Sequence, residues 1–503
     1  TLYEQALEKG AIACILQDVE ISDEILKKYP ESTIVLVEDT VKTLQKLAEY
    51  KRSMCNIPVV AITGSVGKTS TKDMIASVLS QKYKVLKTQG NYNNEIGMPL
   101  TLLSLKDEEV MVLEMGMNSF GEISLLSRIA KPDVAVITNI GTAHIGLLGS
   151  RENILKAKLE ILEGLNKNGT VVVNYDNDLL NEWYEKEKNN YNIITYGTQQ
   201  GSKVLGQNAV FHKNGSTCEA VIDSKTYNVH IPVGGEHFVS NSLCALSVAK
   251  IFEIPVEEAI KGIENFELTK KRMEIKQAKC GAMIINDCYN ANYDSMKAAL
   301  DYIGKLPNLR KIAVLGDMLE LGEYSKELHE EVGKIVAENK VDMLICVGKE
   351  SINIAKEAEK GGVKNIVHCN TNKEAISILK EKLNLEENPN FIGTRKGILD
   401  PNTLSLEERN QLIKEQPAYG NIICRCEMIT EGEIIDAIRR PLGAKSLDGV
   451  KRRTRAGMGR CQAGFCSPKT MEILERELSI SMFDITKAGG ESNMVLGLVK
   501  DSI

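Results

Sequence analysis

The segment VVAITGSVGKTSTKDMI, residues 59–75, constrains the fold of this 503-residue chain more than any other feature. Its β-branched run predicts a buried strand, and the glycines that follow predict a tight turn that opens into a helix. Such a turn directs backbone N–H groups at a phosphate, while the lysine contacts the β- and γ-phosphates and the threonine contacts magnesium. A chance Gly-Lys-Thr turn is the alternative, and Ile62 stands where the usual loop has its first glycine. The predicted ATP-binding residues of this loop are Gly64, Ser65, Gly67, Lys68, Thr69 and Ser70.

Composition narrows the classes of function. A net charge of −6 and a pI of about 5.8 give no extended basic surface of the kind that nucleic acid requires. No stretch has the length and apolar purity of a membrane span, and the N-terminus shows no signal peptide, so we expect a cytoplasmic protein. With 43% hydrophobic residues the chain can bury several cores, and its length predicts three or four domains.

The order of predicted elements indicates several domains. Strands alternate with helices from residue 57 to about 270, which predicts a parallel α/β sheet, and a second alternation begins at GAMIIND, near residue 281. Residues 1–56 are typical of the tail of a small α/β unit, so we expect its start to be missing. Beyond about residue 385, a polar linker leads to a cysteine-bearing, arginine-rich segment for which we expect a small helical domain.

Three polar residues follow or accompany the predicted strands of the first sheet. Glu114 ends a buried strand at the sheet edge where ligands bind, and it is a plausible magnesium ligand. His144 follows the strand VAVITNIG, and a structural role and a ligand role are both open for it. Lys158 falls on the same helical stripe as Ile154, Ile161 and Leu165. A lysine buried there must be paired, neutral or modified.

Four cysteines form two close pairs near the C-terminus, spaced as C-x-C and C-x4-C. Four thiolates suit a 2Fe-2S cluster, and zinc accepts the same ligands. Four free thiols are the remaining alternative. The predicted metal ligands are Cys424, Cys426, Cys461 and Cys466.

The first 385 residues resemble the Mur ligases of peptidoglycan synthesis. The resemblance rests on a series of motifs in a fixed order, and EMGMN and YNAN favour the dipeptide-adding branch of the family. The motifs are TGSVGKTSTK, GNYNNEIGMPLTLL, LEMGMNSFGEI, TNIGTAHI, AKLEIL, DCYNANYDSMKAAL and AVLGDMLELGEYS.

This resemblance implies a cytoplasmic, ATP-dependent ligase. Its substrates would be UDP-N-acetylmuramoyl-tripeptide and D-alanyl-D-alanine, joined through an acyl phosphate, and the ligase module would be monomeric. ATP and magnesium are the implied cofactors.

The resemblance also implies roles for individual residues. Lys68, Glu114, His144 and Lys158 would form the catalytic set. Thr69 and Glu114 would hold one magnesium ion, and His144 would serve a second one together with Lys158 as a carbamate. The remaining implied positions are Asn94 near the γ-phosphate, Asn241 at the adenine, Arg272 and Asp287 as the pair that closes the third domain over the nucleotide, and Asn290 in the same wall.

The C-terminal segment resembles a different family, the bacterioferritin-associated ferredoxins. Similar iron–sulfur domains form the C-terminal part of FAD-dependent oxidoreductases that resemble glycerol-3-phosphate dehydrogenase. A natural fusion and a chimera are both open, because the third ligase domain lacks a clear match to its usual last strands. A redox protein with a degenerate ligase module is the alternative function, but no Gly-x-Gly-x-x-Gly flavin fingerprint supports it. The expected domains are a partial UDP-binding domain at 1–56, an ATP-binding domain at 57–267, a third ligase domain at 268–387 and an iron–sulfur domain at 388–503.

Overall fold

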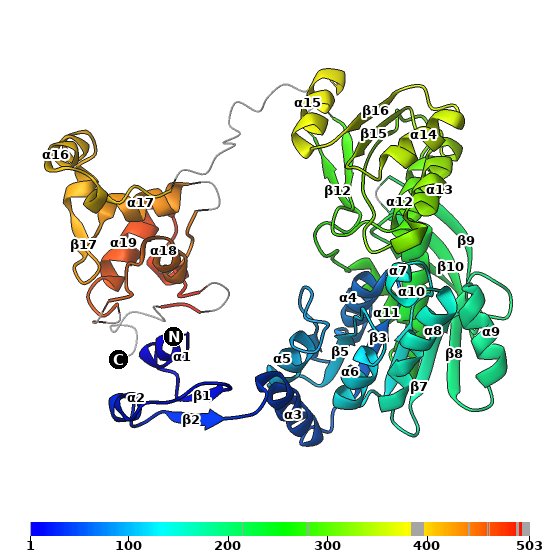
Figure 1. Cartoon of the computed structure of the whole chain (residues 1–503), viewed down its shortest axis with the longest axis horizontal. Coiled ribbons are helices and arrows are strands. Elements are labelled where there is room, and N and C mark those ends of the chain that lie inside the picture. The colour runs from blue at the N-terminus through cyan, green and yellow to red at the C-terminus, as the bar shows by residue number, and fades with distance from the viewer. Residues whose placement is uncertain are drawn as a thin grey trace. The chain divides into compact units, whose positions relative to one another are not determined.

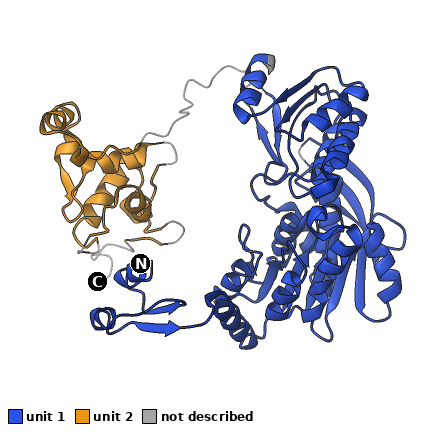
Figure 2. Ribbon diagram, in the orientation of Figure 1, with its two compact units in different colours: residues 1–386 blue, residues 387–503 orange. Residues whose placement is uncertain are grey.

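A computed structural model shows that the chain forms two compact units, residues 1–386 and residues 387–503 (Figure 2). The structure describes residues 2–213, 215–278, 281–383, 397–440, 443–459, 461, 463–488 and 492–494. Most of the expected polar linker therefore lies outside the described residues. The α/β, multi-domain architecture expected from the sequence is confirmed.

A nine-stranded sheet dominates the first unit, in the order β11-β10-β9-β8-β7-β6-β3-β5-β4 (Figure 1). The seven strands β3 to β9 pair in parallel with one another, whereas β10 pairs antiparallel with both β9 and β11. Strands β3, β5 and β6 are buried throughout, which explains their continuous apolar sequences. The strands span Val59–Thr63 (β3), Val85–Lys87 (β4), Val110–Glu114 (β5), Val134–Ile137 (β6), Thr170–Asn174 (β7), Asn192–Gly197 (β8), Val204–His212 (β9), Gly215–Ile222 (β10) and Lys225–Ile231 (β11).

Helices cover both faces of this sheet, and alternate residues of each strand face opposite cores. In β3, Val59 and Ala61 pack in one core, while Val60 and Ile62 pack in the other with residues of α4 and α10. We call the nine-stranded sheet and its helices, residues 57–270 without residue 214, the central module. Its helices are α4 (Lys68–Leu79), α5 (Gly97–Leu103), α6 (Glu122–Ala130), α7 (Ile145–Leu148), α8 (Arg151–Leu159), η1 (Glu160–Gly164), α9 (Asp178–Glu187), α10 (Glu236–Ile251) and α11 (Val256–Glu264).

A second α/β layer follows, which we call the distal module, residues 271–383 without 279–280. Its antiparallel pair β12–β13 precedes a parallel sheet in the order β14-β15-β16. The elements are β12 (Glu274–Gln277), β13 (Met283–Asn286), α12 (Tyr293–Lys305), β14 (Ile312–Gly316), η2 (Gly322–Tyr324), α13 (Ser325–Glu338), β15 (Met343–Val347), α14 (Ile352–Lys360), β16 (Ile366–Cys369) and α15 (Asn372–Leu383).

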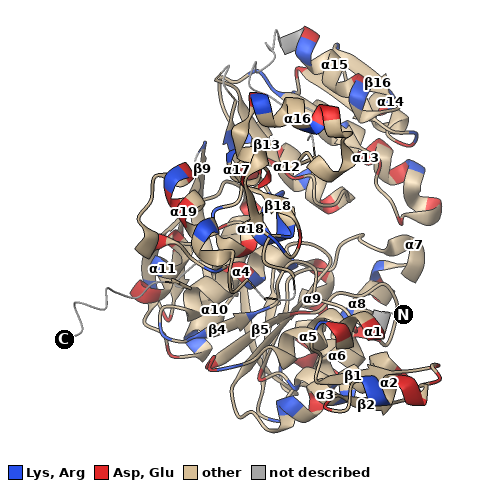
Figure 3. Ribbon diagram, turned by 90° about the vertical axis from the view of Figure 1, so that its left-hand side faces the viewer, with Lys and Arg blue, Asp and Glu red and all other residues tan. Residues whose placement is uncertain are grey.

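Before the central module, the chain forms a small parallel strand pair with flanking helices. These elements are α1 (Leu2–Glu8), β1 (Ala13–Leu16), α2 (Asp23–Lys28), β2 (Thr33–Leu36) and α3 (Thr40–Ser53). Basic and acidic side chains are interspersed along the helices of the chain (Figure 3). Among the described residues, no helix is long and apolar enough to cross a membrane.

The second unit is small and mostly helical. Ile434, Val450 and Leu474, from three different helices, lie in its core with the buried Cys424 and Cys466. Its elements are η3 (Pro401–Thr403), α16 (Leu406–Glu415), η4 (Pro417–Gly420), β17 (Ile422–Cys424), β18 (Ile429–Thr430), α17 (Glu431–Arg439), α18 (Leu447–Thr454), α19 (Ser467–Leu478) and η5 (Met482–Asp484).

Candidate active site

A cavity of about 900 Å³ lies where the central and distal modules meet. The carboxyl ends of β3 and β5 and the start of α4 form one side of it, and the loops that precede α12 form the other. Parallel strands present their carboxyl ends at one edge of a sheet, which is where ligands bind in open α/β folds. The predicted site residues that line the cavity are Ser65, Gly67, Lys68, Thr69, Ser70, Glu114, His144, Asn241, Arg272, Asp287 and Asn290.

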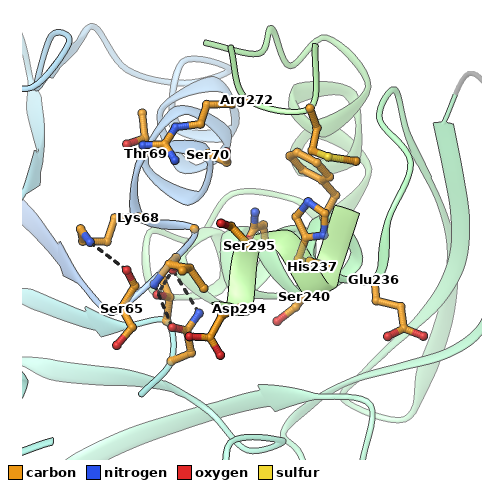
Figure 4. Close-up of a pocket in the computed structure, with 18 of the residues that line it drawn as sticks. Ser65, Lys68, Thr69, Ser70, Glu236, His237, Ser240, Arg272, Asp294 and Ser295 are labelled. Atoms are coloured by element: carbon orange, nitrogen blue, oxygen red, sulfur yellow. Dashed lines mark hydrogen bonds between the residues drawn. The ribbon is translucent and has the colours of Figure 1, made fainter. Parts of the chain in front are cut away.

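The glycine-rich loop between β3 and α4 has the conformation expected of a phosphate loop. Gly67 adopts a left-handed conformation with φ of +78° and forms the N-cap of α4, so the helix begins at Lys68. The Lys68 ammonium donates a hydrogen bond to Gly64 O at 2.8 Å. It donates a second one to Ser65 O at 3.3 Å (Figure 4). Burial lowers the pKa of Lys68, and the nearby Glu114 carboxylate opposes that shift. A cation is therefore fixed beside the loop before any phosphate arrives.

Glu114 ends β5 and is only 2% exposed. Its Oε1 accepts a hydrogen bond from Asn93 Nδ2 at 2.9 Å, whereas its Oε2 has no hydrogen-bond partner among the described residues. A buried carboxylate oxygen without a donor is costly unless a cation occupies the space beside it. The position therefore fits a magnesium ligand.

Lys158 is 1% exposed, and its Nζ has no hydrogen-bond partner in the described part of the chain. Burial, followed by the neighbouring Lys68, holds the pKa of Lys158 well below 10.5. The predicted apolar stripe is altered at its end, because α8 stops at Leu159 and tightens into η1, leaving Leu165 beyond the helices. Ile154 and Ile161 are buried as the stripe requires.

His144 adopts the left-handed conformation with φ of +65°, which is unusual for a residue with a side chain. Its Nδ1 lies 2.7 Å from Glu320 Oε2 of the distal module. Burial lowers the pKa of His144, the neighbouring Lys158 and Lys68 lower it further, and Glu320 opposes the shift. His144 and Lys158 thus interact electrostatically with each other and with Lys68, and Glu114 also acts on Lys158. Their roles as one catalytic set stay a prediction.

At the start of α10, two side chains present polar atoms without partners. Asn241 Oδ1 accepts a hydrogen bond from Thr71 Oγ1 at 2.9 Å, which leaves Asn241 Nδ2 without a partner among the described residues. His237 Nδ1 also has no hydrogen-bond partner among the described residues, and burial lowers the pKa of His237 to about 4. Sequence reasoning missed His237, although the Gly-Gly turn and helix start before it were a usable signal.

The distal module contributes the opposite wall. The Arg272 guanidinium lies over the Tyr289 ring, 4.0 Å from its centroid, and Asp287 Oδ1 accepts a hydrogen bond from Met273 N at 3.0 Å. Burial raises the pKa of Asp287, and Arg272 partly reverses that shift. Asn290 Oδ1 accepts from Ala291 N at 3.0 Å.

The four clustered cysteines of the second unit come together as two pairs. Cys424 and Cys466 are buried, whereas Cys426 is exposed and Cys461 is half-buried. The pKa of Cys461 is lowered mainly by a hydrogen bond with Cys426. The pKa of Cys466 is raised to about 11, mainly by burial and secondly by the neighbouring Cys424. In the described part of the chain, no three His, Cys, Asp or Glu side chains converge on the position of a single metal ion. Four thiolates suit a 2Fe-2S cluster, and zinc accepts the same ligands.

Comparison with known proteins assigns both units to families. The Mur ligase middle domain matches residues 62–249, and the Mur ligase glutamate ligase domain matches residues 271–387. The UDP-N-acetylmuramoyl-tripeptide–D-alanyl-D-alanine ligase of Bacillus subtilis is 40% identical over 385 residues, covering 76% of this chain and 81% of the relative. The chain belongs to the Mur ligase family. The BFD-like [2Fe-2S] binding domain matches residues 422–476, so both resemblances expected from the sequence are confirmed.

Solved Mur ligase structures share the fold. MurF from Acinetobacter baumannii superimposes with a TM-score of 0.69 and 32% identity, covering 77% of this chain and 82% of that protein. MurF from Thermotoga maritima in complex with ADP gives a TM-score of 0.64 and 29% identity, covering 76% of this chain and 91% of that protein.

Three predicted residues of the Mur ligase module do not line the cavity. Gly64 O accepts a hydrogen bond from the Lys68 ammonium, and Lys158 is buried. Asn94 Oδ1 accepts a hydrogen bond from Gly97 N, at the first residue of α5, at 2.8 Å, and its position near the γ-phosphate stays a prediction. Its neighbour Asn93 lines the cavity instead and donates to Glu114.

Proposed function

We propose that residues 1–386 act as an ATP-dependent ligase that joins D-alanyl-D-alanine to the terminal carboxylate of UDP-N-acetylmuramoyl-tripeptide. One observation supports this most directly: a phosphate loop with its fixed Lys68 faces Arg272 and Asp287 of the distal module across a single cavity. Relatives that bear this activity in their names, such as the Bacillus subtilis ligase, align over the same residues. The redox alternative has weaker support, because the ligase motifs extend over most of the chain.

The reaction has two steps. The substrate carboxylate attacks the γ-phosphorus of ATP, which forms an acyl phosphate and releases ADP. The amine of D-alanyl-D-alanine then attacks the acyl carbon, the C–O bond to phosphate breaks, and inorganic phosphate leaves. Lys68 and the backbone N–H groups of the loop offset the charge on the phosphoryl oxygens, while the closed cavity excludes the water that would hydrolyse the acyl phosphate.

The residues present fit two magnesium positions. Thr69 and the partnerless Glu114 Oε2 would hold one ion, and His144 with Lys158 would serve the second. Burial lowers the pKa of Lys158, which favours the neutral amine that reacts with carbon dioxide. Addition of carbon dioxide with loss of a proton would yield an anionic carbamate in place of a buried cation. Magnesium, when bound, offsets the negative charge of the transferring phosphoryl group.

The other residues that line the cavity would contact the nucleotide. Asn241 Nδ2 supplies a donor for the adenine, and Arg272, Asp287 and Asn290 complete the wall over the nucleotide. We place the domain boundaries at 1–56, 57–267, 268–387 and 388–503. Since one chain supplies both walls of the cavity, a monomeric ligase module is sufficient for the reaction. The family resemblance supports a cytoplasmic location for this reaction.

For the second unit we propose a 2Fe-2S cluster held by Cys424, Cys426, Cys461 and Cys466, with zinc as the alternative metal. The paired arrangement of the thiols and the family match at residues 422–476 support the cluster. Amide formation moves no electrons, so the ligase chemistry does not require it.

The deciding experiment measures phosphate release by the full chain with ATP, UDP-N-acetylmuramoyl-tripeptide and D-alanyl-D-alanine. We expect release only when all three are present, together with the pentapeptide product by mass spectrometry. Omitting each substrate in turn is the control. Phosphate release that does not depend on D-alanyl-D-alanine would contradict the proposal.

A further inference from the structure

One carboxylate of the distal module holds the loop that carries His144. Asp294 lies in the first turn of α12, and its Oδ2 accepts hydrogen bonds from Thr142 N at 2.8 Å and from Thr142 Oγ1 at 3.1 Å. These two residues are 152 positions apart in the sequence. Hydrogen bonds to an ionised carboxylate are stronger than those between neutral groups, so this contact is a firm link between the two modules.

The contact is possible only because Thr142 follows a glycine. A Cβ on Gly141 would lie 2.3 Å from Asp294 Oδ2, and Gly141 does not have a positive φ, so glycine is needed there for space. A second glycine, Gly146, repeats the arrangement on the other side of His144. A Cβ on Gly146 would lie 2.5 Å from Gly322 N, and Gly146 N donates to Glu320 O at 3.2 Å. The distal module therefore touches the loop on both sides of His144.

The same loop is bonded to the phosphate loop. Gly141 N donates to Ser65 Oγ at 2.9 Å, and Ser65 N donates to Asn139 O at 3.0 Å. Ser65 O is in turn one of the acceptors of the Lys68 ammonium. Figure 4 labels both Ser65 and Asp294 among the residues that line the cavity. A path of direct hydrogen bonds and one peptide unit thus leads from the distal module to the lysine that contacts the phosphates.

We propose that Asp294 is a positioning residue that couples the seating of the distal module to the geometry of the phosphate loop. By holding Thr142, it fixes Gly141 against Ser65 and keeps His144 at the edge of the cavity. The interaction favours the closed arrangement in which phosphoryl transfer occurs, so it acts on turnover more than on nucleotide binding. This inference rests on the proposed ligase function.

The test compares Asp294→Ala with the parent chain in the ligase assay and in ADP titration calorimetry. We expect kcat to fall at least about tenfold, since two charge-assisted hydrogen bonds are lost, while the Kd of ADP changes less than about threefold. Asp294→Asn keeps one acceptor and should give a kcat between those of the parent and Asp294→Ala. If Asp294→Ala folds poorly, the kcat of Asp294→Asn tests whether the bonds to Thr142 support turnover. Asp301→Asn is the matched control, because Asp301 lies on the same helix and its hydrogen bonds within the described residues go to Lys297 and Asn339 of the distal module.

A double-mutant cycle tests the contact itself. Gly141→Ala should lower kcat in the parent, where the new methyl group meets Asp294, and should cost little more in Asp294→Ala, where the carboxylate is gone. A kcat of Asp294→Ala within twofold of the parent, or an equal loss from Gly141→Ala in both backgrounds, would overturn the inference. An inactive parent would instead contradict the proposed function, and this inference with it.

Discussion

Replacing Lys158 with methionine should stabilise the first unit while removing its activity. Lys158 is 1% exposed, and its amine has no hydrogen-bond partner among the described residues. Methionine has a similar length and no charge, so it can fill the same space without a buried donor. Removing an unsatisfied buried polar group is worth about 1–3 kcal/mol in unfolding free energy.

The difference in unfolding free energy between Lys158→Met and the parent should also depend on pH, because Lys158 can be protonated. The pKa of Lys158 in the folded chain lies well below 10.5, whereas the unfolded chain keeps the ordinary value. Between these two values the unfolded chain binds one more proton, so the parent becomes more stable as the pH rises towards 10.5 and less stable as it falls. The slope is up to about 1.4 kcal/mol per pH unit, and Lys158→Met should lack it.

The single tryptophan makes this measurable in a chain of several domains. Trp183 packs against the core that contains Ile154 and Ile161, so its fluorescence reports the unfolding of the central module. Urea unfolding between pH 7.5 and pH 9.5 in buffer free of carbon dioxide should show the parent gaining stability relative to Lys158→Met. Lys156→Met is the control, because Lys156 is exposed on the same helix.

Two results would contradict this reasoning. Equal pH slopes in the parent and Lys158→Met would show that the buried lysine keeps its proton. A less stable Lys158→Met would show that the amine makes a contact that methionine cannot replace. Added bicarbonate supplies a third comparison, since carbamate formation should raise the stability of the parent alone.

Three further predictions concern activity and the cluster. Lys68→Ala should lower ligation by a factor of about 100 or more, because the transferring phosphoryl group loses its fixed cation; near-normal turnover in the same assay would remove Lys68 from the site. Lys158→Ala should lose ligation without rescue by excess bicarbonate, and a variant equal to the parent would make Lys158 purely structural. Chain purified without oxygen should show visible absorbance that bleaches on reduction, and Cys424→Ser should remove it while leaving ligation intact. Colourless protein with stoichiometric zinc would favour the alternative metal, and lost ligation in Cys424→Ser would show that the two units are coupled.

Features that depend on nearby residues could be predicted from the sequence. The strand, loop and helix at residues 59–75 follow from an apolar run and Gly67, whose left-handed φ disfavours other residues. Glu114 and His144 were placed near each other because parallel strands end at one edge of a sheet. Lys158 was predicted to be buried because its helical period placed it among apolar residues.

Features that depend on the path of a turn or on distant contacts required the tertiary structure. Asn93 and Asn94 are adjacent and chemically identical, and only the turn before α5 decides that Asn93 bonds Glu114 while Asn94 bonds the backbone of Gly97. The contact of Asp294 with Thr142 joins residues 152 positions apart, and no local pattern marks it. A sequence encodes local conformational preferences directly, whereas the choice of a long-range partner is made only when two modules pack closely enough to exclude other arrangements.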